Sequence, residues 1–217
     1  MLVVKICGLT QAKDAELAQR LGAGITGFIF ADSPRRITPE KAESIIKTLK
    51  PGVLKAGIFV NEKISRVNSI IKNLKLDIAQ LAGDESPAYL EKIRGALVFK
   101  VIRVKSAAGL KKNAKLYEKS ADVFLFDTYK KGSFGGTGKA FDWKMVKKAA
   151  VKKPFFIAGG LNPENVRSAI KAASPFGVDA SSGVEKSPGI KDEKKMKKFF
   201  EEIKKSKGKT KKYNLKF

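Results

Sequence analysis

A single cysteine marks the first place in this 217-residue chain where chemistry could occur. Residues 3–6 read Val-Val-Lys-Ile, Cys7 follows them, and Gly8 begins a turn that leads toward a helix. Enzymes built of alternating strands and helices carry their reactive side chains at this kind of position. Because the chain contains no histidine, proton transfer near neutral pH must use a thiol, a carboxylate, a lysine or a tyrosine. Cys7 is therefore the first candidate, and a small buried side chain without a chemical role is the alternative.

A carboxylate stands at the corresponding point of a later strand. Asp127 follows Val-Phe-Leu-Phe at residues 123–126, and burial at the end of such a strand raises the pKa of a carboxyl group, which suits a general acid. A helix or loop cap is the alternative for Asp127 taken alone. Its pairing with Cys7 at one end of the fold favours an acid and base pair.

Two glycine-containing loops follow later apolar segments. Gly159 and Gly160 lie in the sequence Ala-Gly-Gly-Leu, and Ser182 and Gly183 lie in the sequence Ser-Ser-Gly-Val. Glycines after neighbouring strands let backbone N–H groups and the start of a helix approach a phosphate. We therefore expect these four residues to bind a phosphate group, with plain tight turns as the alternative.

The elements that must position these residues form a regular series. Eight short β-rich runs recur, each followed by a turn signal, and their ends lie 21 to 31 residues apart. Each gap leaves room for one helix, as parallel strands require. The pattern predicts a single (β/α)8 TIM barrel of eight parallel strands. The predicted strands are 2–7, 25–30, 54–60, 76–81, 97–103, 122–127, 154–158 and 176–180.

Helix boundaries support this alternation. Pro39, Pro87 and Pro163 each follow a Thr, Ser or Asn that can cap a helix, and proline suits the first helical position. A last helix over about 192–205 turns its apolar residues inward: Met196, Phe199, Phe200 and Ile203. We assign residues 1–206 to the barrel as one catalytic domain and residues 207–217 to a basic C-terminal extension.

The charge balance predicts an anionic partner. The chain has 45 basic and 21 acidic side chains, for a net charge of +24. A small phosphorylated substrate and a nucleic acid would both be attracted by this field. The lysines are scattered over predicted helices without an arginine-rich patch, so we expect no specific nucleic-acid partner. We expect the tail to be solvated, with contact to polyanions as the alternative.

Cysteine usage and hydropathy indicate the compartment. One cysteine cannot form an internal disulfide, which favours a reducing environment. No apolar run reaches the roughly 20 residues of a membrane helix, and the start of the chain lacks a signal-peptide pattern. We therefore expect a cytoplasmic protein without membrane contact.

Barrel closure would bring the first strand beside the eighth. Lys5 shares a strand face with Cys7, and Asp179 lies on the neighbouring strand. A buried Lys5–Asp179 ion pair is the favoured prediction, and a Lys5 that lowers the thiol pKa is the alternative. Trp143 and Phe141 are expected to pack in the core or a loop rather than to bind substrate.

The chain resembles the phosphoribosylanthranilate isomerase family of tryptophan biosynthesis. The resemblance extends from residue 3 to about 205, with the motifs in family order. They are Lys5-Ile6-Cys7-Gly8-Leu9-Thr10, Gly27-Phe28-Ile29-Phe30, Ser33-Pro34-Arg35-Arg36-Ile37, Gly57-Ile58-Phe59-Val60-Asn61, Gln80-Leu81, Phe126-Asp127-Thr128, Gly135-Gly136-Thr137-Gly138-Lys139-Ala140-Phe141-Asp142-Trp143, Ala158-Gly159-Gly160-Leu161-Asn162-Pro163-Glu164-Asn165-Val166 and Val178-Asp179-Ala180-Ser181-Ser182-Gly183-Val184-Glu185.

The resemblance implies an Amadori rearrangement of N-(5'-phosphoribosyl)anthranilate to 1-(2-carboxyphenylamino)-1-deoxyribulose 5-phosphate. It implies that Asp127 protonates the furanose oxygen and that Cys7 removes the C2 proton. Arg35 would hold the anthranilate carboxylate, while Arg36 faces solvent or assists. The iminium nitrogen of the substrate accepts the electrons, so the reaction needs no metal and no organic cofactor. A cationic surround and a nearby helix start are expected to lower the pKa of the Cys7 thiol.

One departure from the family pattern lies after the fourth strand. The family commonly has histidine after Gln-Leu, and here Ala82 follows Gln80-Leu81. A substrate contact or a loop anchor at that point is therefore in question. The resemblance implies a monomer or a homodimer. Two other functions stay open: another phosphosugar isomerase or synthase on the same barrel, and a basic barrel that binds nucleic acid.

Overall fold

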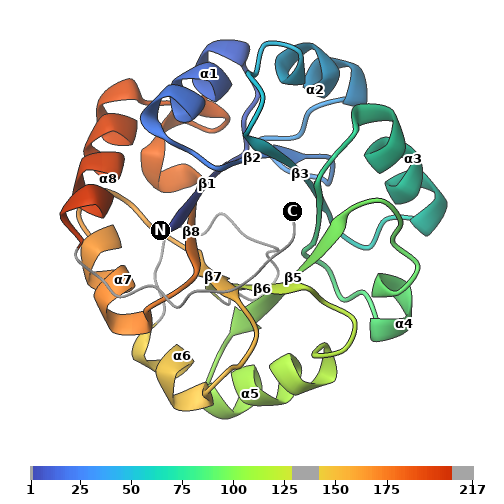
Figure 1. Cartoon of the computed structure of the whole chain (residues 1–217), viewed down its shortest axis with the longest axis vertical. Helices are drawn as coiled ribbons and strands as arrows, with labels where there is room; N and C mark the ends of the chain where they lie inside the picture. The colour runs from blue at the N-terminus through green and yellow to red at the C-terminus, as the bar shows by residue number, and fades with distance from the viewer. Residues whose placement is uncertain (1, 129–141, 207–217) are drawn as a thin grey trace.

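Eight parallel strands close into a barrel in which each strand pairs with the next and β8 pairs with β1. The computed structural model describes residues 2–128 and 142–206, and Figure 1 looks into the ring of strands with the helices outside it. The predicted (β/α)8 barrel is confirmed. The strands are β1 (Val3–Cys7), β2 (Ile25–Ile29), β3 (Leu54–Phe59), β4 (Ile78–Leu81), β5 (Leu97–Val104), β6 (Val123–Thr128), β7 (Phe155–Ile157) and β8 (Gly177–Ala180).

The helices follow the strands in alternation. They are α1 (Ala12–Leu21), α2 (Pro39–Ile46), α3 (Ile64–Leu74), α4 (Pro87–Leu90), α5 (Ala107–Leu116), α6 (Lys144–Ala149), α7 (Val166–Ala173) and α8 (Glu193–Lys205). Between β8 and α8 the chain adds a 3-10 turn, η1 (Ser182–Val184), and a small antiparallel hairpin of β9 (Glu185–Ser187) and β10 (Ile190–Lys191). The sequence pattern did not predict this hairpin.

Two of the three predicted helix starts are confirmed. The Thr38 hydroxyl accepts from the Lys41 N–H at the start of α2, and the Ser86 hydroxyl accepts from the Tyr89 N–H at the start of α4. The third prediction is wrong, because α7 begins at Val166. The Asn162 amide oxygen instead accepts from the N–H groups of Glu164 and Asn165, which closes a turn ahead of the helix.

Side chains alternate between two apolar clusters along the strands. On β6, Phe124 and Phe126 belong to the cluster between barrel and helices, while Leu125 belongs to the cluster inside the barrel. On β1, Ile6 belongs to the outer cluster and Cys7 to the inner one. The two-residue period therefore continues the inward series of β6 to Asp127, toward the same barrel interior.

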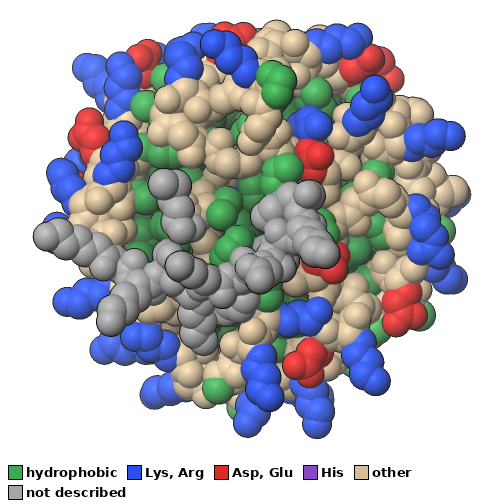
Figure 2. Space-filling view, in the orientation of Figure 1, with side chains coloured by type: hydrophobic (Ala, Val, Ile, Leu, Met, Phe, Trp, Pro, Cys, Tyr) green, Lys and Arg blue, Asp and Glu red, His purple; other side chains and the backbone are tan. Residues whose placement is uncertain are grey.

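The last helix packs as the sequence pattern predicts. Met196, Phe199 and Phe200 of α8 are buried in the outer cluster, and Ile203 packs against it half-buried. Figure 2 shows Lys and Arg side chains around the rim of one face, over the outer helices. In the part of the chain that the structure describes, no helix is long and apolar enough to cross a membrane.

Candidate active site

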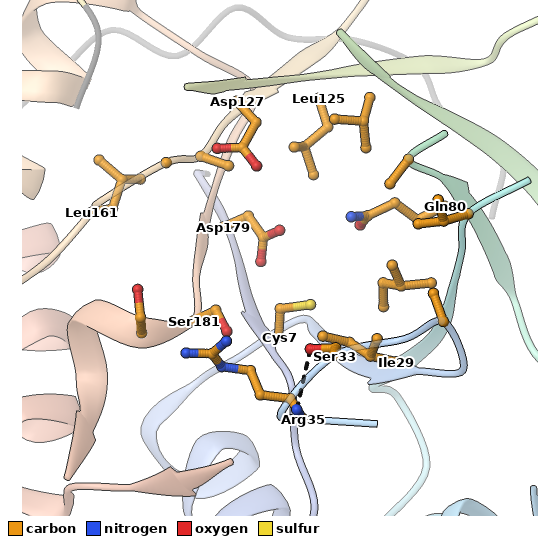
Figure 3. Close-up of a pocket in the computed structure, with 18 of the residues that line it drawn as sticks. Cys7, Ile29, Ser33, Arg35, Gln80, Leu125, Asp127, Leu161, Asp179 and Ser181 are labelled. Carbon is orange, nitrogen blue, oxygen red and sulfur yellow. Dashed lines mark hydrogen bonds between the residues drawn. The ribbon is translucent and has the colours of Figure 1, made fainter. Parts of the chain in front are cut away.

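The carboxyl ends of the strands surround a cavity of about 660 Å³. All eight strands, or the residues directly after them, contribute to its lining. The cavity brings together all seven residues that the sequence singled out: Cys7, Arg35, Asp127, Gly159, Gly160, Ser182 and Gly183. Figure 3 shows Cys7, Asp127 and Asp179 gathered at one side of it.

Cys7 lies beside the buried ammonium group of Lys5. The predicted ion pair is present, since Lys5 Nζ lies 2.9 Å from Asp179 Oδ2 and the Lys5 side chain has no exposed area. Lys5 also interacts with the Cys7 thiol, so the ion pair and the contact with the thiol exist together. The Lys5 ammonium group thus interacts with both Asp179 and Cys7.

The predicted lowering of the thiol pKa is wrong for this structure. Burial raises the pKa of Cys7, and the positive charge of Lys5 opposes this effect without reversing it. The negative charge of Asp179 raises the thiol pKa further. The sequence identified the cation but not the desolvation that outweighs it.

Asp127 has the pKa shift that the sequence predicts. Burial raises the pKa of its carboxyl group to about 6, and the nearby Asp179 adds to the shift. A hydrogen bond from the Thr128 N–H to Asp127 Oδ1 opposes it, with an N···O distance of 2.7 Å. A carboxylic acid with this pKa can both hold and release a proton near neutral pH.

Two further polar side chains each present one unpartnered oxygen atom to the cavity within the described residues. Asp179 Oδ1 and Gln80 Oε1 are buried, and neither has a hydrogen-bond partner among the residues described. Figure 3 shows the Asp179 carboxylate between Asp127 and Cys7, with the Gln80 amide entering from the other side. Such acceptors suit the hydroxyl groups of a sugar. A polar residue in a wholly buried strand was the sequence signal for Gln80.

Arg35 lines the cavity but is already bound to a carboxylate. Its Nε lies 2.9 Å from Glu185 Oε1, and its Nη2 lies 2.8 Å from Glu185 Oε2. Arg36 is exposed, so of the two roles left open for it the solvent-facing one is confirmed. Glu185 could not be identified as a partner from local sequence, because 150 residues separate it from Arg35.

The two glycine loops approach each other and Asp127 closely. A Cβ atom on Gly159 would lie 2.6 Å from Asp127 Oδ1, and one on Gly183 would collide with the Leu161 carbonyl oxygen. Gly159 and Gly160 both have positive φ angles, of 79° and 68°. Within the described residues, the N–H groups of Gly159, Gly160, Ser182 and Gly183 donate no hydrogen bond.

Ala82 forms part of an apolar wall on the opposite side of the cavity. It is buried, and the cavity is also lined there by Ile58, Val101 and Leu125. The loop that follows is anchored by Glu85, whose Oε1 accepts from the N–H groups of Asn61 and Gly83 and whose Oε2 lies 2.6 Å from Lys100 Nζ. The loop therefore has an anchor without a histidine.

Other predicted residues lie away from the cavity or outside the described part. Trp143 packs half-buried against the outer cluster, as predicted. Phe141 and the extension 207–217 lie outside the described residues. Across residues 2–128 and 142–206, no group of three Cys, Asp or Glu side chains is arranged to hold a metal ion.

Comparisons with known proteins agree over nearly the whole chain. A family model described as N-(5'-phosphoribosyl)anthranilate (PRA) isomerase matches residues 4–202. A relative from Caldanaerobacter subterraneus subsp. tengcongensis, named N-(5'-phosphoribosyl)anthranilate isomerase, is 43% identical over 203 residues, which cover 94% of this chain and 98% of the relative.

Solved structures show the same likeness. The phosphoribosyl anthranilate isomerase from Thermotoga maritima is 38% identical, has a TM-score of 0.87, and matches over 94% of this chain and 100% of its own length. A phosphoribosyl anthranilate isomerase in complex with reduced 1-(o-carboxyphenylamino)-1-deoxyribulose 5-phosphate is 36% identical, with a TM-score of 0.84 over the same shares of both chains.

Removing one partner of the Lys5–Asp179 pair is expected to destabilise the protein strongly. Lys5→Met should lower the free energy of unfolding in urea by about 3–5 kcal/mol, because it leaves a buried carboxylate uncompensated. The double variant Lys5→Met/Asp179→Leu should recover most of this loss. Lys47→Met, which breaks the exposed pair with Glu43, should cost less than about 1 kcal/mol. A Lys5→Met variant as stable as wild type would contradict the burial of this pair.

Asp127→Asn is expected to stabilise the fold in a pH-dependent way. The pKa of Asp127 is raised from 3.8 to about 6, so the folded state disfavours the ionised form. The resulting loss of unfolding free energy is absent below about pH 4 and complete above about pH 7, where it reaches about 3 kcal/mol. Thermal melts at pH 4 and pH 8 should show a gain for the variant at pH 8 that shrinks at pH 4. Glu43→Gln, at an exposed site on α2, is the control, and an equal gain at both pH values would contradict the assignment.

Proposed function

This chain belongs to the N-(5'-phosphoribosyl)anthranilate isomerase family, and from that premise we propose that Cys7 is its general base and Asp127 its general acid. The reaction is the Amadori rearrangement of N-(5'-phosphoribosyl)anthranilate to 1-(2-carboxyphenylamino)-1-deoxyribulose 5-phosphate in tryptophan biosynthesis. The observation that carries the assignment is the cavity that Cys7 and Asp127 line together with Arg35 and both glycine loops.

The two residues act on different atoms of the sugar. Asp127 gives its proton to the furanose ring oxygen, the C1–O bond breaks, and the nitrogen lone pair forms the iminium ion. The Cys7 thiolate then takes the proton from C2, and the C–H electrons move toward the iminium nitrogen to give the enolamine. Tautomerisation of the enolamine gives the ketone, so atoms and charge balance without a further reactant.

The pKa values of the free protein determine how the reactive form arises. Burial raises the pKa of the Cys7 thiol, while that of Asp127 is about 6. At neutral pH the dominant form therefore has a neutral thiol and an ionised Asp127. The reactive form carries the proton on Asp127 and the negative charge on sulfur, and it is a minor form of equal total charge. The positive charge of Lys5 favours the thiolate and so increases its share. Once Asp127 has given up its proton, the iminium ion of the substrate favours transfer of the C2 proton to sulfur.

The cavity offers a separate place for each part of the substrate. The N–H groups of the two glycine loops, which donate no hydrogen bond to the part of the chain that the structure describes, suit the phosphate. The apolar wall with Ala82 suits the aryl ring, and Arg35 suits its carboxylate. Asp179 Oδ1 and Gln80 Oε1 are left to accept hydrogen bonds from sugar hydroxyl groups.

The partner we propose is thus a small phosphorylated aminoaldose, with the chain acting as a monomer or a homodimer. The net charge of +24 attracts such an anion. A base that works as a thiolate must stay reduced, which fits the cytoplasm. The competing phosphosugar enzyme would use the glycine loops but would not need Cys7 together with Asp127.

Loss of either proposed proton-transfer group should abolish most of the activity. Cys7→Ala and Asp127→Asn should each lower kcat/KM for freshly made phosphoribosylanthranilate by about 10²–10⁴-fold, the usual contribution of a positioned acid or base. The loss of substrate fluorescence measures the rate. Arg36→Ala is the control, since Arg36 is exposed and should retain the wild-type rate.

The same assay separates the competing functions. The isomerase assignment to these residues would be refuted if the wild type and both variants converted the substrate at equal rates. It would also be refuted if none of the three converted it. Strong, salt-dependent binding of nucleic acid without turnover would favour a binding role instead.

Forcing the two glycine loops apart should weaken phosphate binding. Gly183→Ala places a methyl group against the Leu161 carbonyl oxygen, so the loops must separate. We expect KM to rise at least about tenfold, the equivalent of one lost phosphate contact, and inhibition by inorganic phosphate to weaken in parallel. Gly109→Ala on α5, where a Cβ atom meets only Ser106 Oγ at 3.2 Å, is the matched control. An unchanged KM in Gly183→Ala would place the phosphate elsewhere.

A further inference from the structure

Two buried opposite charges lie beside the cavity and have no part in the proposed proton transfers. They are Glu185 at the start of β9 and Lys191 at the end of β10. The Glu185 side chain is 4% exposed and that of Lys191 is fully buried. A short hairpin at the surface would not need such a pair for its own stability, since burying charges is costly.

Glu185 binds two cations at once. Its Oε1 lies 2.8 Å from Lys191 Nζ and 2.9 Å from Arg35 Nε, and its Oε2 lies 2.8 Å from Arg35 Nη2. The Gly189 N–H also donates to Oε1, at 3.3 Å. These contacts hold the pKa of Glu185 below its usual value despite burial. The carboxylate is therefore an ionised and fixed point beside the cavity.

Lys191 fixes Glu185 to the strand that carries Cys7. Its Nζ donates to the carbonyl oxygen of Cys7 at 2.6 Å and to that of Ser181 at 3.3 Å. Its backbone N–H donates to Asp14 Oδ2 on α1, at 2.8 Å. The hairpin is thus attached to β1, to the end of β8 and to α1. Glu185 cannot move without disturbing these contacts.

The turn at Gly8 also restrains the Arg35 side chain. A Cβ atom on Gly8 would lie 2.6 Å from Arg35 Cδ, so the arginine stem rests directly on the turn after Cys7. Figure 3 shows the Arg35 side chain reaching from the segment after β2 toward Ser181. The guanidinium group is therefore located by Glu185 on one edge and by the glycine turn along its stem.

The geometry of the guanidinium group leaves one edge for a ligand. Arginine has five N–H donors in a planar fork, and a carboxylate can bind two parallel donors. Glu185 takes the edge formed by Nε and Nη2. The hydrogen bonds that the structure records for the guanidinium group within the described residues do not involve Nη1. With respect to residues 2–128 and 142–206, the second edge, formed by Nη1 and Nη2, is therefore available to a second carboxylate.

We propose that Glu185 is a positioning residue that orients Arg35 for the aryl carboxylate of the substrate. Lys191 holds Glu185 in place, and Arg35 bridges two carboxylates, one from the protein and one from the substrate. The role rests on the proposed function, because it concerns the same substrate. The positioning role extends the proposed function, because selectivity for a carboxylated aryl group then depends on Glu185, a residue that does not touch the substrate.

The test compares two substrates in wild type and Glu185→Gln. One is phosphoribosylanthranilate, and the other is N-(5'-phosphoribosyl)aniline, which lacks the carboxylate. The amide keeps the size of the side chain but presents one acceptor instead of two to Arg35. We expect KM for phosphoribosylanthranilate to rise at least tenfold with kcat changed less than threefold, and KM for the aniline compound to stay within twofold.

Four further variants make the result specific. Arg35→Met should lose the same selectivity, and Arg35→Met/Glu185→Gln should lose no more than Arg35→Met alone, because both changes act through one group. Glu185→Asp should restore part of the selectivity and serves as the second variant if Glu185→Gln folds poorly. Glu85→Gln removes a carboxylate of similar burial, paired with Lys100, and should lower the melting temperature without changing the selectivity.

The outcomes are distinguishable from failure of the proposed function. A wild type that converts neither substrate refutes the proposed function itself. An active wild type whose Glu185→Gln and Glu185→Asp variants keep the ratio of KM values for the two substrates refutes the positioning role alone. Equal weakening of both substrates would also refute it, since that result indicates a general loss of structure.

Discussion

One buried ammonium group makes the rest of the site possible. Lys5 has no exposed side-chain area, and its positive charge acts on Cys7, Asp127 and Asp179. Three acidic groups placed together away from water would repel one another and lose their hydration, and a single cation among them offsets both costs in part. Closure of the barrel sets Lys5 opposite Asp179 in the register of β1 and β8. Closure of the barrel therefore places the compensating charge of Lys5 beside the acidic groups of the candidate site.

Lys5 offsets the burial and mutual repulsion of the acidic groups only in part, and this partial compensation favours proton exchange. Lys5 does not bring the thiol pKa below its ordinary value, and it leaves the pKa of Asp127 raised. Fully compensated acids would be stable anions with little tendency to exchange protons. In the mechanism that we propose, a cationic intermediate beside these partly compensated acids would favour their ionised forms.

The sequence predicted the parts of the molecule that depend on local pattern. The eight strands, the position of Cys7 and Asp127 at one end of the barrel, and the cap at Thr38 follow from periodicity and from side-chain chemistry within a few residues. The sign of the Cys7 pKa shift did not follow, because it is a difference between burial and charge that only the packed structure determines. The buried pair of Glu185 and Lys191 could not be predicted for another reason. In a chain with 45 basic residues, nothing local distinguishes a buried lysine from a solvated one.

The cavity wall divides into two halves of different character. Backbone groups of the loops after β7 and β8 form one half, and the side chains of Ile58, Ala82, Val101 and Leu125 form much of the other. Backbone groups persist through most substitutions, whereas side chains change with every substitution. A lineage carrying this barrel could therefore change the shape of the apolar half while keeping the backbone groups that we propose bind the phosphate. The division makes the fold a ready starting point for new substrate ranges, reached by single replacements on β3 to β6.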